Sequence, residues 1–211
     1  MKIEPDKLTR KDRHMLMGSV VVPRPIALVS TVSTDGVLNL APYALFTLIC
    51  YHPVPIVAFT PMRRLGISKK DTLVNIEQTK EFVINMVTED IAQKTNITSK
   101  VFPPEIDEFQ VSGLTPIPSD LVKAPRVSES PINLECRLRE IVEFGKPNIT
   151  GEMIMGEVLR VHIRDDLYRN GIVDSLSLGV IGRMGWAYYT RTRDLFEMKA
   201  PDTPEDAIGK G

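Results

Sequence analysis

Apolar residues along the chain occur in short runs that are typical of β-strands. Residues 26–32 (IALVSTV) are rich in β-branched side chains, and Asp35-Gly36, a dipeptide that favours a hairpin turn, follows them closely. A strand followed by a hairpin signal indicates an antiparallel sheet. Three further runs predict strands of the same kind, at residues 44–50 (ALFTLIC), 55–60 (PIVAFT) and 82–87 (FVINMV).

Two longer segments alternate apolar and polar side chains, which is the period of a half-buried strand. Residues 132–144 place Leu134 and Leu138 on one face. The pattern stops at the turn-forming residues 145–148 and resumes over residues 152–163. These two segments predict a long antiparallel pair.

Two helices are predicted between the strands. The first spans about residues 71–80, with Asp71 as its N-cap and with Leu73 and Ile76 on one face. The second begins near Thr88, carries two acidic residues in its first turn and ends before the Val-Phe-Pro-Pro sequence that follows. Most of the regular structure is therefore predicted to be β-strand.

The organisation of the chain favours one domain. The proline-rich stretch from residue 102 to about residue 126 keeps enough apolar positions to cross the domain as an ordered excursion. Its anchors are Ile106, Phe109, Leu114 and Ile117. Many short strands with few helices indicate one closed or partly closed antiparallel barrel. We expect a single domain over residues 1–200 and a flexible tail over residues 201–211.

Composition excludes several classes of protein. Of the 211 residues 43% are apolar, and the formal net charge is -1, whereas a nucleic-acid-binding domain is usually basic. Cys50 and Cys136 form no CxxC pair or Cys/His cluster, so neither a metal site nor a disulfide framework is expected. The apolar stretches are too short to cross a bilayer, and the N-terminus lacks the apolar core of a signal peptide. A cytoplasmic location is expected.

Basic residues gather before the first predicted helix. A phosphate needs convergent donors, and a helix N-terminus adds free N–H groups and a favourable dipole. The segment therefore predicts a phosphate site, although a solvated basic loop explains it about equally well. The basic and hydroxyl residues of the segment are Arg63, Arg64, Ser68, Lys69, Lys70 and Thr72.

Two other stretches have an unusual composition. Asn39 and Pro42 interrupt an apolar run just after the hairpin signal, and an Asn amide can both donate to and accept from an imide edge. Taken alone, a strand entry bent by proline explains them better. Residues 182–188 combine an Arg, two glycines and the single Trp, which suits contact with a planar ligand. A loop packed on the barrel is the better explanation of that stretch in isolation.

His162 lies in an alternating strand, where a structural role is more common than a catalytic one. The chain contains no GxGxxG or GxxxxGK[ST] sequence, so a Rossmann domain or a P-loop is not indicated.

Separated stretches of the chain, taken together, resemble the flavin reductase-like family, the FMN-binding split-barrel proteins that include flavoredoxin. The resemblance covers about residues 15–200, and the stretches occur in the order of the family. They are PRPIALVST (23–31), DGVLNLAPYALF (35–46), KDTLVNI (70–76), EFVINMV (81–87), GEVLRVHI (156–163) and RMGWAYY (183–189). Ala44 stands where the family pattern often has a hydroxyl or a second aromatic residue.

The resemblance implies a mainly β fold, a Greek-key split β-barrel with a few peripheral helices, that holds FMN without a covalent bond. It also implies a homodimer with each flavin near the subunit interface. Carried over by position, the phosphate would be held by Arg63, Lys70 and Thr72. The isoalloxazine ring would be lined, largely through backbone groups, by Asn39, Leu40, Ala41, Pro42 and Tyr43. Its polar edge would lie near Ser30 and Thr31, Arg183 would approach the flavin, and His162 would lie near the site.

Three functions remain open from the sequence. The first is an NAD(P)H-dependent reductase that passes reducing equivalents through FMN. The second is a flavoredoxin-like electron-transfer protein without its own nicotinamide site, which would use a redox protein as its partner. The third is a protein that binds flavin without turnover. In the first two, hydride and electron chemistry belongs to the cofactor, so no catalytic side chain is required.

Overall fold

A seven-stranded antiparallel sheet forms the body of the protein in the computed structural model, which describes residues 1–63, 69–145 and 151–201. The strand order is β2-β1-β5-β8-β9-β4-β3. β1 and β2 are joined through Gly36, whose φ of 86° is the left-handed conformation that the predicted hairpin turn needs. The strands are β1 (Ala27–Val32), β2 (Leu38–Tyr43), β3 (Phe46–Cys50), β4 (Ile56–Phe59), β5 (Glu81–Met86), β8 (Ile132–Phe144) and β9 (Gly151–Ile163).

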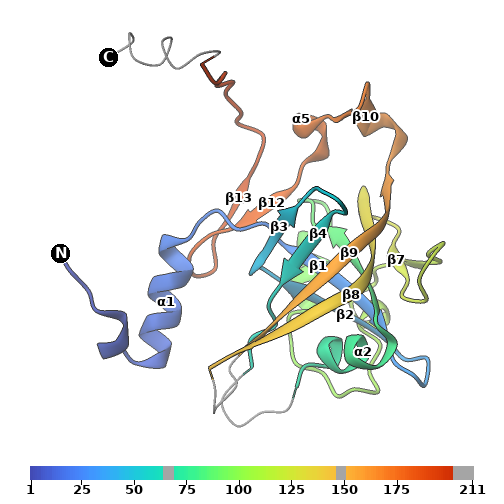
Figure 1. The fold of residues 1–211 in the computed structure, drawn as a ribbon, viewed down its shortest axis with the longest axis horizontal. Helices are drawn as coiled ribbons and strands as arrows, with labels where there is room; N and C mark the ends of the chain where they lie inside the picture. The colour runs from blue at the N-terminus through green and yellow to red at the C-terminus, as the bar shows by residue number, and fades with distance from the viewer. Residues whose placement is uncertain (64–68, 146–150, 202–211) are drawn as a thin grey trace.

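The sheet is curled into a half-barrel, as Figure 1 shows. Tyr43 of β2 and Phe59 of β4 come from strands near opposite ends of the sheet order, yet their ring centroids are 5.1 Å apart. Phe59 also meets Phe82 of β5, edge to face, at 5.6 Å. The predicted barrel and the long β8–β9 pair are therefore confirmed.

The helix α2 (Asp71–Thr79) packs against the inner face of the barrel (Figure 1). Leu73 and Ile76 are fully buried in the interior apolar cluster, so the predicted shared face is confirmed. The predicted N-cap is wrong by one residue. Lys70 is the N-cap, because its carbonyl oxygen accepts from the N–H groups of Leu73 and Val74, and Asp71 is the first helical residue.

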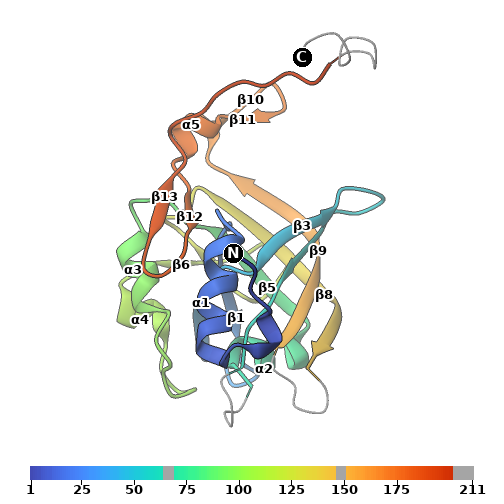
Figure 2. The ribbon, with the colours of Figure 1, turned by 90° about the vertical axis from the view of Figure 1, so that its left-hand side faces the viewer.

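A second apolar cluster covers the outer face of β1 and β2. It includes Leu28 and Leu40 from the sheet, and Phe109 and Leu114, two of the predicted anchors, are buried in it. The remaining anchors, Ile106 and Ile117, are half-buried. The helices on this side are α3 (Ala92–Ile97) and α4 (Glu108–Ser112) (Figure 2). α3 begins later than predicted, because residues 88–91 form a turn in which the N–H of Glu89 bonds to the carbonyl oxygen of Gly179.

The sequence analysis missed the helix α1 (Arg10–Val20), which lies outside the barrel (Figure 1). None of its residues is buried, so it has no apolar stripe of helical period that could reveal it. A hairpin of β12 (Ile181–Arg183) and β13 (Tyr189–Arg191) follows late in the chain. The short elements are η1 (Pro5–Lys7), β6 (Pro116–Ile117), β7 (Arg126–Val127), η2 (Asp165–Leu167), β10 (Tyr168–Arg169), β11 (Ile172–Val173) and α5 (Ser175–Leu178).

Within the described ranges, no helix combines the length and the apolar character needed to cross a membrane. Most of the expected C-terminal tail, residues 202–211, lies outside those ranges.

Candidate functional site

Three predicted site residues meet at the start of α2. The Asn39 Nδ2 donates a hydrogen bond to Thr72 Oγ1 at 3.0 Å, and the Tyr43 hydroxyl donates to the same oxygen at 2.9 Å. All three side chains are buried. Burial raises the pKa of Tyr43, so its hydroxyl stays neutral and keeps its proton for this bond. The structure thus brings a residue predicted for the phosphate together with two predicted for the ring.

The predicted ring residues on β2 divide between the two faces of the sheet. Ala41 and Tyr43 pack with the interior cluster, whereas Leu40 is fully buried in the outer cluster. This division follows from the twofold alternation of a strand. Side chains of all five residues 39–43 therefore cannot contact one ligand together. The backbone of β2 can, because β2 is a terminal strand of the sheet, and Pro42 lies half-buried on it.

Ser30 and Thr31 have hydroxyls that are bonded inside the protein. Ser30 donates to the carbonyl oxygen of Pro125 at 2.5 Å and accepts from Asn85 Nδ2 at 3.1 Å. Thr31 accepts from Asn75 Nδ2 of α2 at 3.0 Å. Both residues are fully buried. Their hydroxyls hold neighbouring segments to β1, and their place near the polar edge of a ligand stays a prediction.

Arg63 and Lys69, two basic residues before α2, form ion pairs with other parts of the chain. Arg63 pairs with Glu152 of β9, and Lys69 pairs with Glu77 of α2 at 2.5 Å. Lys70 is the N-cap of α2. Arg64 and Ser68 lie outside the described residues. The alternative of a fully solvated basic loop does not describe Arg63, whose side chain is only 19% exposed.

The Arg63–Glu152 pair retains hydrogen-bonding capacity. Glu152 is 1% exposed; its Oε1 pairs with Arg63, whereas its Oε2 and the Nε of Arg63 have no hydrogen-bond partner. A guanidinium carries five N–H donors. Arg63 can therefore remain paired with Glu152 while it donates to a second anion.

Arg183 lies in a different part of the molecule from Thr72, on the β12–β13 hairpin. Its guanidinium donates to the carbonyl oxygen of Trp186 and stacks over the ring of Tyr189, with Cζ 4.6 Å from the centroid. Trp186 is 70% exposed and has a φ of 58°, a left-handed conformation that is uncommon for a bulky residue. The hairpin and α3 border a cavity of about 840 Å³. Its lining includes Gln93, Asn96, Arg183, Trp186, Tyr189 and Arg191.

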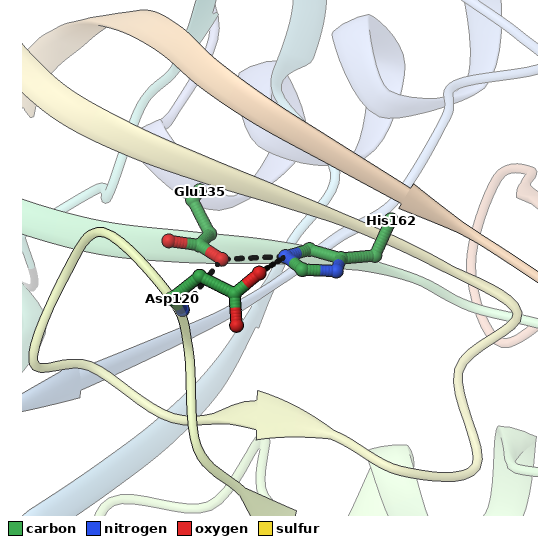
Figure 3. Close-up of side chains that lie close together, drawn as sticks. All are labelled: Asp120, Glu135 and His162. Atoms are coloured by element: carbon green, nitrogen blue, oxygen red, sulfur yellow. Dashed lines mark hydrogen bonds and ion pairs between the residues drawn. The ribbon is translucent and has the colours of Figure 1, made fainter.

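His162 belongs to a hydrogen-bonded group on β8, β9 and the loop before β7. Its Nε2 lies 2.5 Å from Glu135 Oε1. Figure 3 shows the two side chains pointing toward each other. Glu135 is fully buried and also accepts from the N–H groups of Asp120 and Leu121. Burial acts against ionisation, yet these bonds hold the pKa of Glu135 below its usual value.

The third side chain in Figure 3, Asp120, pairs with Arg160 at 2.7 Å. The oxygen and nitrogen atoms of Asp120, Glu135 and His162 that could bind a metal lie within 4.8 Å of one another. Because each of these groups already has a protein partner, the contacts agree with the structural role that was favoured for His162.

Two buried carboxylates beside the predicted site were missed by the sequence analysis. Glu152 pairs with Arg63, and Glu108 Oε2 accepts from the backbone N–H of Leu40 at 3.0 Å. Both partners are distant in sequence; Glu108 and Leu40 are 68 positions apart. No local pattern marks either carboxylate, since an acidic residue near a turn or a strand end is usually exposed.

Comparison with known proteins assigns the class. Residues 17–189 match the family described as the flavin reductase like domain, and the chain belongs to this family. The matched region contains the group of Asn39, Tyr43 and Thr72 (the Thr72 group), the Arg63–Glu152 pair and Arg183.

Three solved structures have closely similar folds. Component B of nitrilotriacetate monooxygenase from Bacillus cereus is 32% identical, with a TM-score of 0.90 over 94% of this chain and 98% of that chain. The 2-nitrobenzoate 2-nitroreductase NbaA of Pseudomonas fluorescens is 31% identical, with a TM-score of 0.86 over 96% and 97%. A putative flavin reductase with a split barrel domain from Shewanella frigidimarina NCIMB 400 has a TM-score of 0.82 at 23% identity, over 95% and 100%, and supports the fold alone. The fold is a split barrel.

Proposed function

We propose that the protein binds FMN and acts as an NAD(P)H-dependent oxidoreductase. The observation that carries this proposal is the meeting of Asn39, Tyr43 and Thr72 at the start of α2, within a flavin reductase-like domain. A polar cluster at a helix start, next to a terminal strand, suits a ligand with a phosphate at one end and a polar ring at the other.

The residues near the start of α2 fit a phosphate. First-turn N–H groups of a helix generally lack a partner within the helix, apart in α2 from that of Leu73, which bonds to the Lys70 carbonyl oxygen, and the macrodipole favours an anion there. Thr72 Oγ1 accepts two hydrogen bonds, which leaves its own proton for a third partner. Arg63 has donor capacity beyond its pair with Glu152. We assign the phosphate to Arg63, Lys70 and Thr72.

The ring would lie along β2, where backbone groups of residues 39–43, apart from the N–H of Leu40 that Glu108 occupies, can reach its polar edge. Bound flavin supplies the hydride and electron chemistry. The protein binds the ring, orients it and excludes water from one side of it.

The open cavity beside Arg183 supports a site for the nicotinamide donor. Aromatic rings at Trp186 and Tyr189 can stack on a base, and Arg183 can pair with a phosphate, whereas Arg191 is already paired with Glu89. The similarity to a monooxygenase component B and to a nitroreductase supports an acceptor that is either a partner enzyme's flavin or a small oxidised compound.

A homodimer is part of the proposal. β3 is the other terminal strand, and consecutive residues Leu48 and Ile49 are 47% and 48% exposed, so it presents apolar side chains on both faces. Leu45 and Tyr51 extend this surface. A second copy of the chain would cover it.

Both cysteines are free thiols, which supports the expected cytoplasmic location.

Spectra of the purified protein test the function. We expect a yellow protein that releases FMN rather than FAD on denaturation, and that is bleached anaerobically by NADH or NADPH. Absence of FMN binding would overturn the proposal. Bleaching by dithionite but by neither nucleotide would overturn the reductase activity and favour electron transfer from a redox protein. Light scattering tests the dimer, and a monomer that retains its flavin would contradict it.

A further inference from the structure

A buried carboxyl group lies against β2, beside the residues proposed to hold the flavin. Glu108 is the first residue of α4 and is 6% exposed. Its Oε2 accepts the N–H of Leu40 at 3.0 Å. Because β2 is paired with β1 along one side only, this bond ties α4 to the strand's other edge.

Glu108 is connected to the start of α2 through two adjacent residues of β2. The N–H of Leu40 donates to the Glu108 carboxylate, and the side-chain amide of the neighbouring Asn39 donates to Thr72 Oγ1 at 3.0 Å. Asp71 precedes Thr72 and is the first residue of α2. A phosphate at this helix start would therefore add negative charge to a region that already holds Asp71 and Glu108.

The charged groups that raise the pKa of Glu108 are acidic, while Lys70, the N-cap of α2, opposes the rise in the pKa of the adjacent Asp71. Burial is the main cause that raises its pKa to about 7, with Asp71 of α2 and Asp107 of α4 adding to the rise and the N–H of Leu40 opposing it. Burial and, to a smaller extent, Glu108 raise the pKa of Tyr43, whose hydroxyl therefore stays neutral. From α3, Lys94 bonds to the carbonyl oxygen of Gly113, at the opposite end of α4.

We propose that Glu108 is a positioning residue of the phosphate site that takes up a proton from solvent when FMN binds. The inference rests on the proposed function, because the phosphate must lie at the start of α2 to act on Glu108. A phosphate carries up to about two negative charges, and repulsion from an ionised Glu108 is strong where water is excluded. Protonation removes this repulsion. The carbonyl oxygen of the neutral acid still accepts from Leu40, so β2 keeps its position.

Titration of FMN into the apo-protein between about pH 7 and about pH 8.5 tests the proposal, since FMN itself is almost entirely a dianion in this range. If binding raises the pKa of Glu108 by one unit, FMN affinity falls roughly fourfold across the range. Calorimetry in two buffers of different ionisation enthalpy should show uptake of about half a proton near pH 7.5.

Glu108→Gln is the main variant, because its amide oxygen can still accept from Leu40 while its charge is absent. We expect its FMN affinity to be independent of pH over the same range, and to exceed that of the unmodified protein at the alkaline end. A residue with a merely structural role would give weaker binding at every pH. Riboflavin should show a smaller slope than FMN. Glu129→Gln is the matched control, since Glu129 also accepts from a backbone N–H, that of Thr115, and should leave the slope unchanged.

The same pH slope in Glu108→Gln would overturn the inference but not the proposed function, as would FMN binding without proton uptake by the unmodified protein. The uptake measurement needs no variant, so it decides the question even if Glu108→Gln does not fold. Failure of FMN to bind at any pH would overturn both proposals.

Discussion

The Thr72 group and the Arg183 turn are the two places where polar and aromatic side chains of the proposed site gather, and they are built in opposite ways. Thr72 is 1% exposed, and its hydroxyl accepts bonds from two buried side chains. In the turn, Trp186 is 70% exposed, and Arg183 is held by one carbonyl oxygen and one aromatic face. One region is closed and the other is open to solvent.

This difference suits the closed region to holding the flavin and the open region to binding and releasing a second ligand. A buried polar group that loses its partner destabilises the whole domain, so the Thr72 region can keep a ligand in a fixed position but tolerates little change. Exposed side chains contribute little to stability and can move when a second ligand arrives. We therefore expect substitutions in the first region to change stability and flavin affinity together, and substitutions in the turn to change turnover.

The largest effect is expected for Arg63→Ala. Removing Arg63 leaves Glu152 charged and buried without a partner, which should lower the free energy of unfolding by about 3–5 kcal/mol. FMN affinity should also fall by about tenfold or more, because a charge-assisted bond to phosphate is lost. Denaturant unfolding and titration with FMN and riboflavin measure the two effects.

A double variant separates these roles of Arg63. In Arg63→Ala with Glu152→Gln the buried charge is removed, so most of the stability should return while FMN affinity stays low. Riboflavin affinity should be nearly unchanged throughout. Equal losses for both flavins would mean that Arg63 supports the fold or the ring and not the phosphate. Lys69→Ala is the comparison, since its half-exposed pair with Glu77 is expected to contribute less than ~1 kcal/mol.

Thr72→Val should cost about 1–3 kcal/mol of unfolding free energy, because the Asn39 amide and the Tyr43 hydroxyl lose their shared acceptor. FMN affinity should fall as well. Thr79→Val, at the end of the same helix, removes bonds to the carbonyl oxygens of Asn75 and Glu81 and is the control for helix stability. Loss of stability without loss of FMN affinity would remove Thr72 from the phosphate site.

Glu108→Gln should stabilise the apo-protein at alkaline pH. The pKa of Glu108 is about 7 in the folded state against 4.5 for the free side chain, so the folded protein binds more protons between these values. Its contribution to stability therefore decreases as the pH rises from about 4.5 to about 7. Above this window the variant should be more stable by up to ~3 kcal/mol, which thermal melts at several pH values would show. Equal melting temperatures for Glu108→Gln and the unmodified protein at alkaline pH would contradict a destabilising, ionised Glu108.

The smallest effect on stability is expected in the turn. Trp186→Gly relieves a positive φ and removes an exposed ring, so the free energy of unfolding should change by less than ~1 kcal/mol. Arg183→Met should raise KM for the nicotinamide nucleotide about tenfold, because a charge-assisted contact is lost, with little change in FMN affinity. Steady-state kinetics and FMN titration distinguish these outcomes. A large loss of FMN affinity would move Arg183 into the flavin-holding region.

The strands could be predicted from the sequence because their signals are local. The alternation over residues 132–144 gave the observed bounds of β8, and the Asp-Gly signal located the β1–β2 turn. α1 could not be predicted from an apolar stripe, since none of its residues is buried. The start of α3 depends on a bond from Glu89 to Gly179, a residue far along the chain.

The candidate site was predictable only in part, for the same reason. Asn39 and Thr72 were candidates from local composition, Tyr43 was added by the family resemblance, and the structure brings the three into contact. Glu108 and Glu152 were missed because their partners lie far away in sequence. The division of residues 39–43 between two faces follows from strand alternation, once β2 is known to have apolar clusters on both sides.

The edge of β2 also bears on how copies of this protein can associate without aggregating. A bare strand edge recruits further strands, which is a route to fibrils. On β2, Glu108 occupies the N–H of Leu40, and Pro42 has no N–H to offer. Strand addition at this edge is therefore blocked near its middle. Two copies would therefore not associate by pairing strands at β2, which leaves the exposed apolar surface of β3 as the face that a second copy would cover.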